Sequence, residues 1–195
     1  GSEVKVSALV EKPRHRAGLE FITVVCTVQS GGVDALISKS TVLVPSKEIA
    51  ESKPAEPIAT KAEPINSELT VISKQINQAQ LSAYAKASGD DNPLHLDSEF
   101  AASTQFGGII AHGMLTLAFV SEMMTSAHGR YWLESGGLRV RFKGAAYLED
   151  HVAAWGNLSK EQDSSRTYSV GVRNTNSGQE LIAGTASFMI NNQDK

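Results

Sequence analysis

The sequence predicts an α+β fold in which an antiparallel sheet is wrapped around one central, buried helix. The first observation is a helical pattern over residues 112–128, in which Glu122 is the only Asp, Glu, Lys or Arg. A helix that is apolar on most sides is normally a buried one. The second observation is the series of strand-like runs that follows, at 137–147, 152–158, 166–173 and 181–190. One buried helix followed by four or five strands favours a sheet that packs around that helix.

The elements before this helix follow from their residue patterns. Asn77 can cap the start of a helix, and Leu81, Tyr84 and Ala85 recur behind it at helical spacing. In chain order we predict a strand, this helix, a polar loop, a short helix and a glycine-bearing loop, at 68–73, 77–88, 89–96, 98–104 and 106–108.

The N-terminal residues 3–45 are predicted to be β structure. Residues 19–29 are rich in β-branched and aromatic side chains, a Ser-Gly-Gly turn follows, and 35–44 form a second strand. The C-terminal end of the chain has the same layout. The runs LISKSTVLV at 36–44 and LIAGTASFM at 181–189 suggest a weak internal repeat, although any two hairpins share such a composition.

A change of composition separates these two parts of the chain. Four of the six prolines, Pro45, Pro54, Pro57 and Pro64, are spaced there by Ala, Glu and Lys. Repeated prolines prevent a continuous helix or ladder, and the segment has little apolar surface with which to order itself. We therefore predict an extended or disordered linker at 46–66, between an N-terminal strand segment and a domain at 67–191.

Composition excludes several classes of function. Eighteen Lys and Arg against twenty-one Asp and Glu give a net charge of −3, which offers no electrostatic footprint for nucleic acid or an anionic membrane. The single cysteine, Cys26, excludes an intrachain disulfide and any multi-cysteine metal site. No apolar run approaches the ~20 residues of a membrane span. We expect a soluble, cytoplasmic protein with no nucleic-acid or membrane partner.

The first segment with chemical potential is SGDDNPLHLD at 88–97. Gly89 permits unusual backbone angles, and Pro93 fixes its own φ and extends the residue before it. Such a loop can hold Asp90 and His95 in a defined geometry with Asn92 between them, and an acid and an imidazole directed at one point can position a water and move its proton. The alternative is an ordinary Asx-rich turn in front of a helix capped by the final Asp of the segment.

The second segment is IAHGML at 110–115. Gly113 is in the first turn of the predicted buried helix, where backbone N–H groups lack intrahelical acceptors and the helix dipole favours negative charge. A carbonyl that becomes an enolate could be stabilised there, as in an oxyanion hole. Alternatively, Gly113 is small only because the helix packs tightly on a strand. We expect His112 to be a structural histidine, and we assign no role to His15, His128 or His151.

Together, the two segments resemble the MaoC-like (R)-specific enoyl-CoA hydratases, the hydratase 2 family, which have the hot-dog fold. The resemblance spans residues 69–190 and is densest in YAKASGDDNPLHLDSEFAASTQFGGIIAHGMLT at 84–116. It implies a hot-dog domain at 67–191 and makes residues 3–45 look like the last strands of a degenerate first hot-dog copy. It also implies a homodimer, because hot-dog domains usually close their sheets by dimerisation.

The resemblance also implies roles for single residues. Asp90 and His95 match the pair that binds and activates water, and Asn92 matches a residue that orients this site. Gly113 matches the glycine whose N–H binds the thioester carbonyl. Ser121 matches a position near the active site in some members, although a serine on a buried helix can also bond back to its own helix.

The activity implied is addition of water to a trans-2-enoyl thioester to give the (R)-3-hydroxyacyl thioester, or the reverse dehydration, with Asp90 as the base. The substrate is carried by CoA or acyl carrier protein, and no cofactor is expected. Asp90, His95 and His112 could bind a metal, but the chemistry does not require one and we expect none. The alternatives are a hot-dog thioesterase and a non-catalytic acyl-thioester binding or interaction module of a larger synthase.

Overall fold

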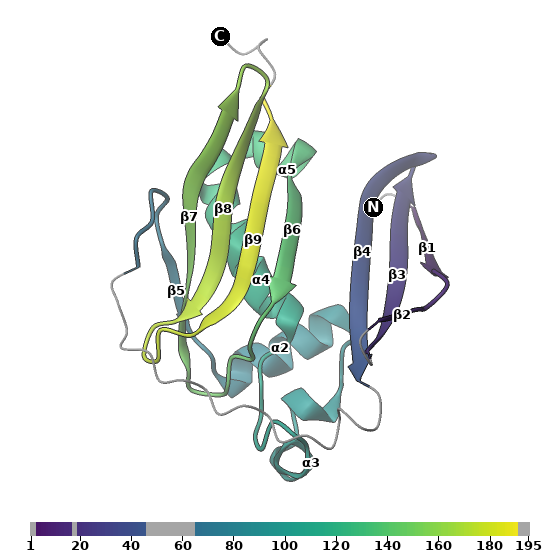
Figure 1. Ribbon diagram of the computed structural model, residues 1–195, viewed down its shortest axis with the longest axis vertical. Coiled ribbons are helices and arrows are strands. Elements are labelled where there is room, and N and C mark those ends of the chain that lie inside the picture. The colour runs from purple at the N-terminus through teal and green to yellow at the C-terminus, as the bar shows by residue number, and fades with distance from the viewer. Residues whose placement is uncertain (1–2, 17–18, 46–64, 191–195) are drawn as a thin grey trace. The chain divides into compact units, whose positions relative to one another are not determined.

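The computed structural model describes residues 3–16, 19–45 and 65–190 (Figure 1). The chain divides into two compact units, Gly1–Pro57 and Ile58–Lys195. Most of the linker predicted at 46–66 is outside the described residues, so that its extended or disordered state stays a prediction. Among the residues described, no helix is both long and apolar enough to cross a membrane.

The first unit contains a four-stranded antiparallel sheet. Strand β3 is central: β4 pairs with it along one edge, and β1 and β2 pair with successive parts of its other edge. The two strands predicted from composition are confirmed as β3 and β4, whereas β1 and β2 were not specified from the sequence. The strands are β1 (Val4–Val10), β2 (Arg14–Arg16), β3 (Leu19–Ser30) and β4 (Val33–Pro45).

One face of this sheet is aliphatic and exposed. The register places Val6 opposite Val28 and Ile22 opposite Val42, and residues directly opposite each other share a face. Val6 is 61% exposed, and Val42 is also exposed. An aliphatic sheet face of this kind is normally covered in a soluble protein, so that the first unit presents apolar surface that its own described strands do not bury.

The second unit contains a five-stranded sheet in the order β5-β7-β8-β9-β6, with every pairing antiparallel (Figure 1). This confirms the predicted sheet, although two strands have other bounds. The run predicted at 137–147 is a strand only as far as Phe142, and the strand predicted at 68–73 begins at Ile72 and ends at Gln75. Beyond Phe142 the chain turns away, and Lys143 and Gly144 both donate their N–H groups to the Leu181 carbonyl. The strands are β5 (Ile72–Gln75), β6 (Gly137–Phe142), β7 (His151–Gln162), β8 (Ser165–Asn174) and β9 (Glu180–Met189).

The helix α4 (Gly113–His128) packs on one face of this sheet and forms the core with it. Val120, Met123 and Met124 on the helix are almost fully buried, as are alternate strand residues such as Val170 and Val172. Because strand side chains alternate between faces, these strands present a continuous apolar surface to the helix. The predicted central helix is therefore confirmed.

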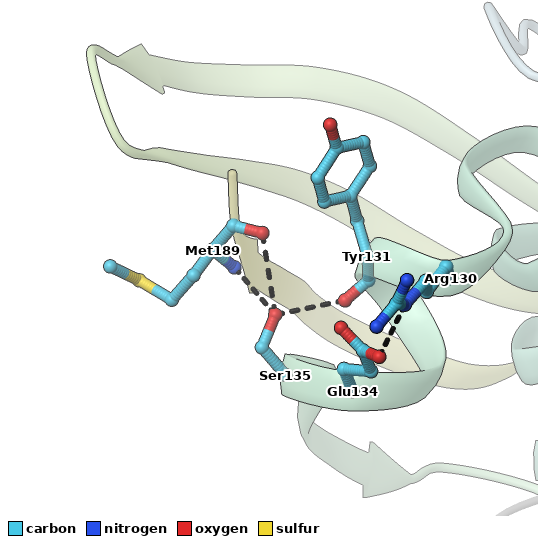
Figure 2. A network of polar contacts seen from close by, with 5 residues as sticks. All are labelled: Arg130, Tyr131, Glu134, Ser135 and Met189. Atoms are coloured by element: carbon cyan, nitrogen blue, oxygen red, sulfur yellow. Dashed lines mark hydrogen bonds and ion pairs between the residues drawn. The ribbon is translucent and has the colours of Figure 1, made fainter. Parts of the chain in front are cut away.

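Four shorter helices complete the second unit: α2 (Gln78–Ser88), the 3-10 turn η1 (Pro93–His95), α3 (Ser98–Ser103) and α5 (Arg130–Ser135). The predicted start of α2 is confirmed, because Asn77 accepts from the Gln80 N–H at 2.9 Å while the Gln80 side chain accepts from the Asn77 N–H. The helix α5 was not predicted. Figure 2 shows how it is tied to the end of β9: the Ser135 hydroxyl donates to the Tyr131 carbonyl and accepts from the Met189 N–H.

Candidate active site

The loop between α2 and α3 is held by local hydrogen bonds. Helix α2 ends at Gly89, whose φ of 75° is in the left-handed region. The Ser88 hydroxyl then accepts from the Asp90 N–H at 3.2 Å, and the Asn92 side chain accepts from the Leu94 N–H at 3.0 Å. The Asx turn considered from the sequence is therefore present. The same hydrogen bonds hold the loop that carries Asp90 and His95, so that an Asx turn and a loop that positions catalytic side chains are compatible interpretations of this segment.

Three side chains come together beside this loop. One carboxylate oxygen of Asp90 and one ring nitrogen each of His95 and His112 all lie within 4.8 Å of one another. The Asp90 side chain is exposed, His95 is 8% exposed and His112 is 1% exposed. The acid and the imidazole selected from the sequence are thus adjacent, beside the packed rings of His95, His112 and Tyr84.

A hydrogen bond fixes which nitrogen of His95 carries a proton. Its Nδ1 lies 2.8 Å from the Ile110 carbonyl oxygen. A carbonyl only accepts, so that Nδ1 donates and Nε2 of the neutral ring keeps its lone pair. The Ile110 carbonyl is itself held, because the neighbouring Ala111 N–H donates to the Ala146 carbonyl at 2.7 Å. His95 can therefore accept a proton from a bound water through Nε2.

His112 is held by the loop and by two rings. Its Nε2 donates to the Asp90 backbone carbonyl at 3.0 Å, and its ring centroid lies 3.9 Å from that of His95 and 4.8 Å from that of Tyr84. Burial lowers the pKa of His112, and the nearby His95 acts in the same direction, while Asp90 opposes both. Sequence reasoning treated His112 as structural and gave Tyr84 no role at the site. Both residues lie within 84–116, where the family resemblance is densest, and this position in the sequence could have indicated that they belong to the site.

Gly113 is the first residue of α4 and is exposed. His112 precedes it at the N-cap position without capping the helix through its side chain, and the Gly113 N–H has no acceptor among the described residues. A methyl group at position 113 would lie 3.1 Å from Cε1 of Phe142. Both sequence interpretations of this glycine are therefore supported, since it has an open N–H and it also packs closely against β6.

Ser121 is outside this cluster of side chains. It lies eight residues after Gly113 on α4, about two helical turns along the helix. Its hydroxyl accepts from the indole N–H of Trp132 at 3.0 Å. This bond connects α4 to α5, and a substrate-orienting role for Ser121 stays a prediction.

Asp90, His95 and His112 are residues of the types that bind transition metals. However, one nitrogen of each histidine already donates to a backbone carbonyl. The expectation of a metal-free reaction stays a prediction. If it is right, prolonged treatment with EDTA followed by desalting leaves the activity of the protein unchanged, and a loss of activity that zinc restores would contradict it.

Comparison with known proteins gives a consistent picture. A family model described as "MaoC like domain" matches residues 59–179. The (R)-specific enoyl-CoA hydratase of Aeromonas caviae is 37% identical over 86 residues, which is 43% of this chain and 62% of that protein. The chain therefore spans less than two thirds of this relative's length.

Solved structures show the same likeness. The structure of the (R)-hydratase from A. caviae involved in PHA biosynthesis matches with a TM-score of 0.55 and 29% identity, over 62% of this chain and 92% of that one. A MaoC-like dehydratase matches with a TM-score of 0.78 over 98% of this chain and 71% of that one. At 20% identity, this second match shows the fold alone.

Proposed function

Because the chain belongs to the MaoC-like domain family, we propose that it hydrates trans-2-enoyl thioesters to (R)-3-hydroxyacyl thioesters or catalyses the reverse dehydration. One observation carries this proposal: the Asp90 carboxylate lies next to the His95 ring, and Nδ1–H of that ring donates to the Ile110 carbonyl. The (R) configuration is supported by the relatives named as (R)-specific hydratases.

In the hydration direction, a water is held by hydrogen bonds to the Asp90 carboxylate and to Nε2 of His95. As the water oxygen forms its bond to C3 of the enoyl group, Asp90 takes one of its protons. The π electrons of the C2–C3 bond move toward the thioester carbonyl and give an enolate. The proton taken by Asp90 is then returned to C2, so that the site regains its starting state and the net change is the addition of one water. General-base catalysis of this kind contributes typically 10²–10⁴-fold.

The enolate needs a hydrogen-bond donor at its oxygen, and the start of α4 supplies one. The exposed Gly113 N–H has no acceptor of its own among the described residues, and the helix dipole favours negative charge at this end. A preorganised donor binds the developing oxyanion more strongly than the neutral carbonyl, which lowers the barrier. Asn92 contributes by holding the loop that carries Asp90 and His95.

Loss of enoyl absorbance with crotonyl-CoA as substrate tests the activity. Asp90→Asn and His95→Gln should each lower kcat by about 10²–10⁴-fold. Asp91→Asn is the matched control, because Asp91 is the adjacent exposed carboxylate and lies outside the cluster. Full activity of the Asp90 or His95 variant would show that the assigned roles are wrong.

The same assay separates the alternative functions. Release of free thiol from acyl-CoA would identify a thioesterase. Retention of acyl-CoA without turnover would identify a non-catalytic binding module of a larger synthase. The carrier is part of the proposal as well: we propose an acyl-CoA or acyl carrier protein thioester, and a comparison of rates across short and long enoyl chains on both carriers identifies the preferred substrate.

We also propose that the protein is a cytoplasmic homodimer. Met114 is 56% exposed and Phe142 is 52% exposed, although they lie at the start of α4 and at the end of β6 beside the proposed site. Moreover, β6 is an edge strand of its sheet, and an unpaired edge next to exposed apolar side chains favours association. Light scattering at micromolar concentration tests the dimer, and cell fractionation tests the compartment.

Finally, we propose that residues 3–45 are the tail of a first hot-dog copy. The pairing of β1 and β2 with β3, and of β3 with β4, repeats the antiparallel order of β7, β8 and β9. The fold likeness to a MaoC-like dehydratase extends over 98% of the chain, so that it includes residues 3–45 as well as the second unit, and this supports the proposal. A structure determined by experiment tests this, because superposition of β3–β4 on β8–β9 should preserve both register and twist.

A further inference from the structure

His112 joins the two halves of the proposed site. Its side chain donates to the backbone carbonyl of Asp90, which is 22 residues earlier in the chain. Its ring packs against the His95 ring. Its own peptide group leads directly into Gly113, the first residue of α4. The residues proposed to activate water and the residue proposed to bind the thioester carbonyl are thus connected through this one side chain.

We propose that His112 is a positioning residue: its neutral, Nε2-protonated imidazole holds the Asp90 backbone and the His95 ring in register with the N–H of Gly113. This inference rests on the proposed function, since it concerns the geometry of the same site. It differs from the expectation that His112 is structural, because the ring contacts the backbone of Asp90 and the ring of His95, the two residues proposed to activate water.

The hydrogen-bond partners of His112 define its protonation state. The Asp90 carbonyl accepts, so that Nε2 must carry a hydrogen. Nδ1 is buried and has no partner among the described residues. A proton on Nδ1 would be a buried donor without an acceptor, which is unfavourable. Burial lowers the pKa of His112 accordingly, and the ring stays neutral at pH 7.

The position of His112 in the chain shows why the ring matters for the reaction. The N-cap side chain of a helix commonly bonds to the N–H groups of the first turn. The His112 side chain does not, and turns instead to the Asp90 loop. The N–H of Gly113, the residue that follows His112, has no acceptor among the described residues and is open to a ligand. A displacement of about 1 Å between reacting groups can cost 10²-fold in rate, so that loosening this connection should reduce turnover more than binding.

Two variants separate the contribution of the His112 ring from that of its N–H donor. His112→Phe keeps a flat ring against His95 but cannot donate to the Asp90 carbonyl. His112→Gln loses the ring but offers an N–H at a similar reach. With crotonyl-CoA, His112→Phe should lower kcat on the order of 10- to 100-fold with KM changed less than about threefold. His112→Gln should recover at least about half of that loss on a logarithmic scale. His151→Gln, at the exposed start of β7, is the control.

Hydrogen exchange gives a readout that does not depend on activity. Amides of residues 89–95 should exchange faster in His112→Phe than in the wild-type protein, and His112→Gln should restore their protection. Nitrogen NMR of the wild-type protein gives a further test without any variant: it should show His112 neutral with its proton on Nε2 at pH 7.

The outcomes distinguish this inference from the proposed function. A folded His112→Phe protein with wild-type kcat and unchanged exchange would overturn the positioning role while leaving the hydratase activity standing. An imidazolium, or a proton on Nδ1, at pH 7 would overturn it too. A wild-type protein that hydrates no enoyl thioester would refute the proposed function. The positioning of the loop would then still be supported if exchange responds to the two variants as expected.

Discussion

Asp90, Asn92 and His95 lie within six residues of one another, yet they are held in different ways. The Asp90 N–H donates to Ser88, and Asn92 accepts from Leu94, so that both are fixed by neighbours in the sequence. His95 is fixed by a carbonyl 15 residues away. Local hydrogen bonds therefore shape the loop, while distant contacts hold the Asp90 carbonyl and determine which nitrogen of the His95 imidazole can act as a base.

The Asn92 contact leads to a prediction on stability. Asn92→Ala removes the acceptor for the Leu94 N–H at the start of η1, which should cost about 1 kcal/mol of unfolding free energy. kcat should fall as well, because η1 carries His95. Asn92→Ser keeps a capping oxygen and should lose less of both. Thermal denaturation and crotonyl-CoA kinetics on the three proteins measure this, and equal values for Ala and Ser would contradict the capping role.

Gly113 leads to a prediction on activity. In Gly113→Ala the new methyl group would approach the Phe142 ring to 3.1 Å, a contact that the half-exposed ring can relieve by a small shift. Stability should change little, whereas the methyl group narrows access to the N–H, so that kcat/KM should fall tenfold or more, on the order of the loss of one oxyanion donor. If the double variant Gly113→Ala, Phe142→Leu regains full activity, the effect is steric crowding rather than access to the N–H.

At the scale of elements, the pairing of β6 with β9 places Phe142 beside the start of α4. The two strands pair along six residues each, from Gly137 opposite Ser187 to Phe142 opposite Ile182. The backbones of β6 and β9 lie very close together at Gly184, because a Cβ atom at that position would lie 2.1 Å from the Arg139 carbonyl oxygen. The edge of the sheet next to the site thus depends on a residue without a side chain.

We therefore expect Gly184→Ala to destabilise the protein. The added methyl group meets backbone atoms of β6, which cannot move without breaking the ladder, and overpacking of this kind costs typically about 1–3 kcal/mol. Gly137→Ala is the matched control in the same strand pair, since its Cβ would have no neighbour closer than 3.8 Å. Urea denaturation compares the two variants. A similar midpoint for both would show that β6 can shift freely.

At the scale of the whole molecule, two histidines relate stability to pH: His112, which is buried, and His128, which is half-buried. Burial lowers the pKa of His112 and of His128, and the positive charge of Arg166 adds to the effect at His128. Both side chains are neutral in the folded protein near pH 7, whereas in the unfolded chain they bind a proton below about pH 6.5. The unfolded state then binds more protons, so that acidification destabilises the fold.

The unfolding free energy should therefore fall as the pH is lowered from 7 to 5, by up to about 1.4 kcal/mol per pH unit for each such histidine. His128 packs against the rings of Tyr168 and Phe188, so that His128→Phe should fit and should make this pH dependence less steep. Urea denaturation at several pH values measures the slope. An unchanged slope in His128→Phe would rule out the role of burial.

Much of the fold could be predicted from local pattern. Asn77 and Gly89 bound α2, and the run after His112, in which Glu122 is the only Asp, Glu, Lys or Arg, forms the central helix. The prediction of strands and helices was less complete where contacts between distant residues determine the structure. The strand-like run after Gly137 ends at Phe142, because the next two N–H groups bond to Leu181 instead of continuing the ladder. Helix α5 was not predicted, since its short run depends on packing and on contacts with α4 and β9.

By itself, the sequence identified the loop that carries Asp90 and His95, an acid and an imidazole of the types that activate water. It also identified Gly113 as a glycine at the start of a buried helix. Only the tertiary structure decided that His112 joins them and which ring nitrogens carry protons. The physical reason is that both histidines are fixed by backbone carbonyls, of Ile110 and of Asp90, that are 15 and 22 residues distant. Every residue has a backbone carbonyl. The folded chain alone decides which carbonyl lies beside an imidazole, and the residue types in the sequence do not reveal it.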